Sequence, residues 1–214
     1  MIYVDIETIP TERPEIIERV TSKLSAPSNY KDPEKIEAYI EAQKPEAVHK
    51  TGLSGLFGQV LMIGFAFDDE PVKVIREGAE ADILQAFRNV ACRVKSQDQE
   101  YCTNTLVGHN ILGFDAPFLS QRMMINGLKP LFRHGGKPWD MPIDDTMTMF
   151  ACGTRTMYSL ENLCLAFGVP TPKGEMTGSS VYDYYKEGRI DEIAEYCARD
   201  VEATRAIYKR MMGL

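Results

Sequence analysis

The sequence predicts an α/β fold in which a mixed central sheet is flanked by helices. Two observations indicate this fold. Apolar and polar residues alternate over residues 2–8 with the period of two that is typical of a strand, whereas apolar residues recur at helical spacing over residues 80–94. The chain has 214 residues, of which 44% are hydrophobic, so it can bury a sizeable core. We expect a single domain over residues 1–214.

The first part of the chain predicts three strands. After the strand at residues 2–8, residues 59–67 form a mostly apolar run that suits a buried strand. Residues 71–76 suit its hairpin partner, because a polar turn at residues 68–70 separates the two. We therefore expect the three strands to form a meander.

A long segment, residues 11–58, separates the first two strands. It is far longer than the few residues that a hairpin loop needs, which indicates folded structure within it. Asp32 and Pro33 have the pattern of a helix N-cap and first helical position, and Ile36, Tyr39 and Ile40 would give that helix an apolar side. We predict a helical insertion.

The second part of the chain predicts four helices and one more strand. Apolar residues recur at three- and four-residue steps in the longer helices, and capping residues, prolines and glycines mark several ends. The expected elements are a helix at residues 80–94, a strand at residues 105–108, a helix from Asp115 to Gly127, a helix between a Ser159 cap and a Gly168 stop, and a helix at residues 190–212.

Composition makes several classes of protein improbable. No apolar run approaches the ~18 residues of a membrane span, and the N-terminus lacks the basic and apolar regions of a secretory signal. We expect a cytoplasmic protein with no membrane partner. Five cysteines without a CxxC pair argue against a disulfide framework and a thiolate zinc site, and predict buried reduced thiols.

The charge balance bears on nucleic-acid binding. Lys and Arg total 24 and Asp and Glu total 31, a net charge of −7, which argues against a broad basic face that grips nucleic acid. A site that gathers carboxylates around divalent cations would be compatible with this balance, because the bound ions reverse the local charge. The arrangement of the acids therefore matters more than their number.

Four acids occur where they can converge. Asp5 and Glu7 lie on one face of the first strand, Asp115 lies at a strand-to-helix junction, and Asp200 lies on the last helix. Such a cluster suits oxygen-binding Mg²⁺ or Mn²⁺, and two ions about 4 Å apart would stabilise an in-line phosphoryl displacement. Tyr196 is four residues before Asp200, so its phenol would reach the same site and orient a water. Without that partner, Tyr196 would be interpreted as a half-buried aromatic residue.

At these residues the sequence resembles the DEDDy group of 3'-5' exonucleases of the ribonuclease H-like fold. Within that group it is similar to the exonuclease domain of family B DNA polymerases, in the form of stand-alone bacterial or phage enzymes. The sister DEDDh group has a histidine where this chain has Glu195. The three motifs D-x-E, N-x-x-x-F-D and Y-x-x-x-D fall on Asp5 and Glu7, on Asn110, Phe114 and Asp115, and on Tyr196 and Asp200.

The resemblance implies a metal-dependent exonuclease that acts on 3' ends of DNA, single-stranded or frayed, and releases nucleoside 5'-monophosphates. It implies two divalent ions, Mg²⁺ or Mn²⁺, held by the four carboxylates, with Tyr196 completing the catalytic set. Asn110 and Phe114 would contact the terminal nucleotides, although Asn110 also suits a turn after the preceding strand. The alternatives are a 3'-5' exoribonuclease on the same site and a non-catalytic module that binds nucleic-acid ends.

A basic segment lies between the second and third motifs. Residues 116–139 contain no acid, so their bases and aromatic residues would suit a wall that contacts phosphates and stacks bases. A solvated loop that happens to be basic is the alternative. The residues concerned are Arg122, Lys129, Arg133 and Lys137, with Phe132 and Trp139 as stacking surfaces, and Lys173 as a further phosphate contact.

Overall fold

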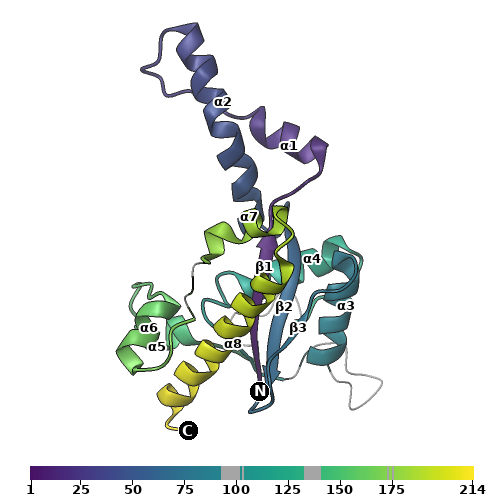
Figure 1. Cartoon of the computed structure of the whole chain (residues 1–214), viewed down its shortest axis with the longest axis vertical. Coiled ribbons are helices and arrows are strands. Elements are labelled where there is room, and N and C mark those ends of the chain that lie inside the picture. The colour runs from purple at the N-terminus through teal and green to yellow at the C-terminus, as the bar shows by residue number, and fades with distance from the viewer. Residues whose placement is uncertain (93–101, 103, 133–140, 173, 175) are drawn as a thin grey trace.

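The structure is a computed structural model that describes residues 1–92, 102, 104–132, 141–172, 174 and 176–214. A five-stranded mixed sheet with the order β3-β2-β1-β4-β5 forms its centre (Figure 1). The strands β1, β2 and β3 form the predicted antiparallel meander, and β4 and β5 extend it in parallel. The strands are β1 (Ile2–Ile9), β2 (Gln59–Phe67), β3 (Lys73–Ile75), β4 (Leu106–Gly108) and β5 (Ile143–Asp145).

Eight α-helices are present in the described part of the chain. Helices α3 and α4 pack on one face of the sheet, while α8 crosses the other face and carries α5, α6 and α7 against it (Figure 1). The helices are α1 (Pro14–Thr21), α2 (Pro33–His49), α3 (Glu80–Ala91), α4 (Asp115–Ile125), α5 (Thr146–Ala151), α6 (Leu160–Phe167), α7 (Val181–Lys186) and α8 (Ile190–Met212), with short 3-10 helices η1 (Lys50–Leu53) and η3 (Gly178–Ser180).

The alternation in β1 separates an apolar face from a functional face. Ile2, Val4 and Ile6 are buried in the core cluster under α3 and α4. The residues between them point toward α8, where Tyr3 packs against Tyr208 with ring centroids 5.8 Å apart. The strand therefore places Asp5 and Glu7 on the α8 side of the sheet.

Local signals located several helices correctly. The predicted helix at residues 190–212 coincides with α8. Asp32 caps α2 by accepting a hydrogen bond from the Glu34 amide at 3.0 Å, and Ser159 caps α6 as expected. The prediction missed β5, α1, α5 and α7, because these elements span only three to eight residues and short segments show little periodicity.

The insertion between β1 and β2 consists of α1, α2 and η1, and α2 extends away from the sheet as an arm (Figure 1). None of the residues of α2 is buried. Ile36, Tyr39 and Ile40 are only partly covered, and Tyr39 packs on Tyr30 within the arm at 5.3 Å between ring centroids. The predicted apolar side of this helix thus does not join the core.

The composition-based predictions can be compared with the structure. Four of the five cysteines are buried as expected, but Cys152 is exposed, and none forms a disulfide. Among the described residues, no helix combines the length and the apolar character needed to cross a membrane.

Candidate active site

Strand β1 places the side chains of Asp5 and Glu7 close together. Glu7 is only 6% exposed and Asp5 is partly buried. Oxygen atoms of both carboxylates and the sulfur of Cys197 on α8 lie within 4.8 Å of one another. The pairing of β1 with β2 shifts register between Glu7 and Thr8, so the strand is irregular directly after the second acid.

Helix α4 begins at the third acid. Asp115 is its first residue and is 4% exposed. Its carboxylate accepts a hydrogen bond from the Ile6 amide at 3.2 Å. The Ile6 amide is available for this bond because β4 pairs with β1 only at Ile2 and Tyr3 and does not reach Ile6. The residue between Asp5 and Glu7 is therefore tied directly to the third acid.

Helix α8 supplies the fourth acid and the tyrosine. Asp200 is 9% exposed, and its carboxylate is hydrogen-bonded to the hydroxyl of Tyr196 one turn earlier. Burial, and then the charge of Asp200, raise the pKa of Tyr196 above its ordinary value. The phenol therefore stays protonated and can donate a hydrogen bond.

All five predicted catalytic residues line one cavity of about 220 Å³. Asn110 and Phe114 of the second motif line it as well, so the structure brings together the residues of the three motifs. The sequence did not single out the remaining lining residues, which are Ile6, Thr8, Leu53, His109 and Gly178.

The site gathers four acids in a largely buried place. Burial, with repulsion from the neighbouring carboxylates, raises the pKa of Asp5 and of Glu7 well above their ordinary values. Burial also raises the pKa of Asp115 to about 7 and that of Asp200 to about 6. In the described part of the chain, no Lys or Arg forms an ion pair with these four acids. The four carboxylates fit hard divalent cations.

Asp145 is a supporting residue that the sequence analysis missed. It is 2% exposed, and its carboxylate accepts hydrogen bonds from the amides of Asn110 and Leu112, both at 3.0 Å. The same carboxylate caps α5 by accepting from the Met147 amide at 2.9 Å. It thus holds the loop of the second motif, in which Asn110 has a left-handed φ of 58°. An Asp before a helix start was the available sequence signal.

His109 lines the cavity, but its ring nitrogens are hydrogen-bonded to other parts of the protein. One ring nitrogen lies 3.0 Å from the Thr146 hydroxyl and the other 2.8 Å from the Tyr158 carbonyl oxygen. Because a carbonyl only accepts, Nε2 donates to Tyr158. Both nitrogens are therefore engaged away from the four acids.

The structure corrects part of the predicted basic wall. Arg122 is buried, at 8% exposure. Its guanidinium donates to both carboxylate oxygens of Glu80, at 2.8 and 2.6 Å, and to the Gly55 carbonyl at 3.3 Å. The prediction of a phosphate contact by Arg122 is wrong, because these partners occupy the guanidinium inside the protein.

The other members of the wall have three different outcomes. Phe132 is 6% exposed and belongs to the core, so the prediction of a stacking surface there is wrong. Lys129 is exposed. The remaining predicted contacts, Arg133, Lys137, Trp139 and Lys173, lie outside the described residues.

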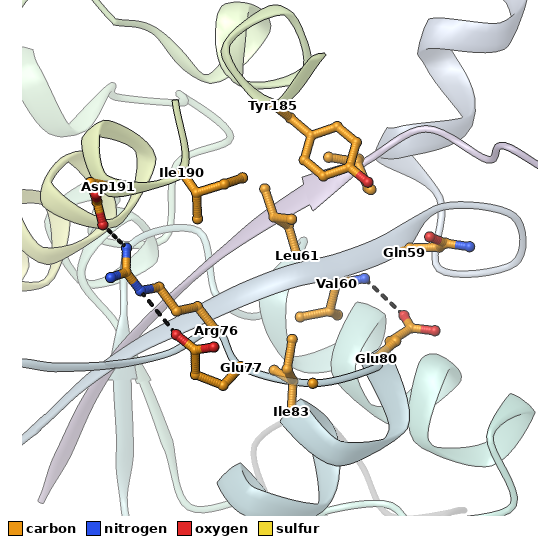
Figure 2. A pocket seen from close by; sticks show the side chains of 12 residues that line it. Gln59, Val60, Leu61, Arg76, Glu77, Glu80, Ile83, Tyr185, Ile190 and Asp191 are labelled. Atoms are coloured by element: carbon orange, nitrogen blue, oxygen red, sulfur yellow. Dashed lines mark hydrogen bonds and ion pairs between the residues drawn. The ribbon is translucent and has the colours of Figure 1, made fainter. Parts of the chain in front are cut away.

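A larger cavity of about 490 Å³ lies between β2, α3 and the start of α8 (Figure 2). Its charged groups are paired: Arg76 donates to Asp191 at 2.6 Å and lies 3.8 Å from Glu77, and Glu80 accepts from the Val60 amide at 2.8 Å. Paired charges do not require a ligand. The smaller carboxylate cavity is therefore the candidate active site.

Comparison with known protein families agrees with this geometry. Residues 75–214 match the model of a family of predicted 3'-5' exonucleases related to the exonuclease domain of PolB. The chain belongs to this family. The matched region contains Asp115, Tyr196 and Asp200 but begins after Asp5 and Glu7. In the structure, Asp5 and Glu7 line the same cavity as Asp115, Tyr196 and Asp200 of the matched region.

A solved structure supports the fold over the whole chain. The family B DNA polymerase from the hyperthermophilic archaeon Pyrobaculum calidifontis matches with a TM-score of 0.60 and 17% sequence identity. The match covers 99% of this chain and 24% of the polymerase, so the chain corresponds to about a quarter of that protein. At this identity the similarity establishes the ribonuclease H-like fold, as predicted. No curated protein matches the chain.

Proposed function

We propose that this chain is a metal-dependent 3'-5' exonuclease that hydrolyses phosphodiester bonds at 3' ends of DNA and releases nucleoside 5'-monophosphates. The convergence of four carboxylates from β1, α4 and α8 on one cavity carries the proposal. Burying acids together without a cationic partner costs stability. Such a cost is expected where the acids serve a ligand.

Asp5, Glu7, Asp115 and Asp200 would hold two divalent cations, Mg²⁺ or Mn²⁺. When bound, these ions would lower the pKa of the attacking water and stabilise the attacking and leaving oxygens of the displacement. The acids must lose their protons to serve as ligands, and their raised pKa values follow from burial and mutual repulsion. A bound cation reverses that effect.

Tyr196 would orient the attacking water rather than remove its proton. Its phenol is protonated and already directed at Asp200, so it can hold a water beside that carboxylate. Asn110 and Phe114 line the same cavity and would contact the terminal nucleotide. The Phe114 ring, which packs against Phe118 at 5.4 Å between centroids, offers an apolar surface to a base.

The size of the cavity favours a single-stranded end. At about 220 Å³ it is smaller than the ~300–1,000 Å³ of pockets that enclose drug-sized ligands. We propose that the last nucleotide enters this cavity single-stranded or frayed. Exposed Lys129 and, beyond the described residues, Arg133, Lys137 and Lys173 remain proposed phosphate contacts.

The test is digestion of 5'-labelled single-stranded DNA, duplex DNA and RNA with Mg²⁺, Mn²⁺ or EDTA. We expect stepwise shortening of DNA from the 3' end with either metal and none with EDTA. Glu195→Gln is a matched control for Asp200→Asn, because Glu195 is on the same helix but 74% exposed at its side chain. Cleavage of RNA alone would reassign the substrate, and binding without cleavage would indicate an end-binding module.

A further inference from the structure

We propose that Cys197 turns part of the carboxylate site into a binding site for thiophilic divalent cations, the class of Zn²⁺ and Cd²⁺, held by Asp5, Glu7 and Cys197. Binding there would inhibit the cleavage that Mg²⁺ supports. The binding follows from geometry alone, whereas its effect on cleavage rests on the proposed function.

The three ligand atoms are close enough to share one ion. Two carboxylate oxygens and the Cys197 sulfur all lie within 4.8 Å of one another. Ligands at the usual zinc distances of about 2.0–2.3 Å sit roughly 3.5 Å apart in a tetrahedral site. Small side-chain rotations would therefore bring all three to one cation.

The packing of α8 on the sheet fixes the sulfur in this position. Cys197 has no exposed surface, and its thiol donates a hydrogen bond to the Asp5 carbonyl oxygen at 3.7 Å. Gly64 is paired with Asp5 in the sheet, and a Cβ at that position would come within 2.8 Å of the sulfur. The glycine thus leaves the space that the thiol occupies beside the acids.

Glu7 gives a second, independent reason to expect a cation at this position. Glu7 is 6% exposed as a residue, it lines the carboxylate cavity, and no ion pair to it is found within the described residues. A buried carboxylate is normally hydrogen-bonded or coordinated to a metal. Its oxygen is one of the three atoms directed at the shared point.

The chemistry of the donors separates two classes of metal. Mg²⁺ and Mn²⁺ prefer oxygen ligands, so they would use the four acids and leave the thiol protonated. Zn²⁺ and Cd²⁺ bind thiolate, and on binding they would replace the thiol proton, which passes to solvent. Such an ion would draw Asp5 and Glu7 toward Cys197 and away from the all-oxygen arrangement. Asp5 and Glu7 would then belong to an active site when Mg²⁺ or Mn²⁺ is bound and to an inhibited site when Zn²⁺ or Cd²⁺ is bound.

The binding is tested by titrating the metal-free chain with Cd²⁺ and recording the thiolate-to-cadmium charge-transfer absorbance. We expect a band that Cys197→Ser abolishes and Asp5→Asn weakens. Cys92 and Cys102, which are buried in the same core cluster, are another source of such a band. Cys92→Ser and the exposed-thiol control Cys152→Ser must therefore keep the component that Cys197→Ser loses. A band unaffected by Cys197→Ser, or no band, would overturn the proposal.

Two further measurements separate this inference from the proposed function. Thermal unfolding of each variant, with Cys197→Ala included, shows whether the variant is folded. If the band is lost only in variants that do not fold, the result counts against the proposal. With the Mg²⁺ rate of each variant as its own reference, Cys197→Ser should raise the Zn²⁺ concentration for half-inhibition by about 10- to 100-fold. If the chain cleaves no nucleic acid, the proposed function fails while the Cd²⁺ titration still tests the site. Unchanged Zn²⁺ inhibition in an active enzyme would reject this inference alone.

Discussion

The two ends of α4 bury charge in opposite ways. At its start, Asp115 lies with three other acids and without a basic partner in the described structure. In its last turn, Arg122 forms a two-pronged ion pair with Glu80, which also accepts from the Asn126 amide group at 3.0 Å. One cluster is fully paired and the other is not.

The difference separates structural charge from functional charge. A buried ion pair is tolerable because attraction and hydrogen bonds offset the loss of hydration. Four neighbouring acids have no such compensation until a cation binds, so their pKa values are raised. We interpret the first cluster as a ligand site and the second as part of the scaffold.

Removing one of the four acids should have the largest effect on cleavage. Replacing Asp5, Glu7, Asp115 or Asp200 singly with Ala should lower kcat by at least about 10³-fold, because each is proposed as a metal ligand. Thermal unfolding in EDTA should remain cooperative. The melting temperature of Asp5→Ala and Glu7→Ala should equal or exceed that of the wild type, because a repelling charge is gone, whereas Asp115→Ala also removes the acceptor of the Ile6 amide. Near-wild-type turnover of Asp200→Ala in Mg²⁺ would refute the four-acid site.

A variant at the other end of α4, Arg122→Met, should affect stability and leave cleavage unchanged. Arg122→Met should lower the unfolding free energy by about 3–5 kcal/mol, because the largely buried Glu80 loses its cationic partner. Cleavage per folded molecule should be unaffected. Denaturant unfolding measures the loss, and Asp183→Asn, which breaks the exposed pair with Lys186, should have no measurable effect. Equal effects of the two variants would mean that burial of the Arg122 pair is energetically unimportant.

Replacing Tyr196 tests whether cleavage needs a positioned water in addition to the metal ions. Tyr196→Phe should lower kcat by about 10- to 10³-fold with metal binding retained, because the phenol positions a water that the metal has already activated. Single-turnover kinetics with parallel Mn²⁺ titration separate the two effects. An unchanged rate would make Tyr196 a half-buried aromatic residue with only a packing role.

The last prediction concerns pH. The pKa of Asp115 is about 7 in the folded chain and ordinary, about 3.9, in the unfolded chain. The native state therefore binds more protons between these values, and this group's contribution to stability falls as pH rises from about 4 to 7. In EDTA, Asp115→Asn should show a less negative slope of unfolding free energy against pH than wild type. Parallel slopes for the two proteins would contradict the raised pKa.

Much of the site could be predicted because its geometry is local. Alternation along β1 puts Asp5 and Glu7 on one face, and a four-residue step puts Tyr196 beside Asp200. Capping residues marked where α2 and α6 begin. The gathering of the motifs on one cavity was predicted by resemblance to a family, because no local rule brings residues 5, 115 and 200 together.

The amino-acid sequence alone shows which residues share a face of a strand or helix, since the period of two or 3.6 is a property of the backbone. Which charges are buried, and with which partners, follows from long-range packing. Arg122 looked like a surface base until packing placed it against Glu80, 42 residues away. Asp145 and Cys197 likewise acquire their roles from contacts with distant Asn110 and Asp5. The desolvation that gives such groups their energetics depends on long-range packing, which a charged or polar residue does not reveal in its local sequence.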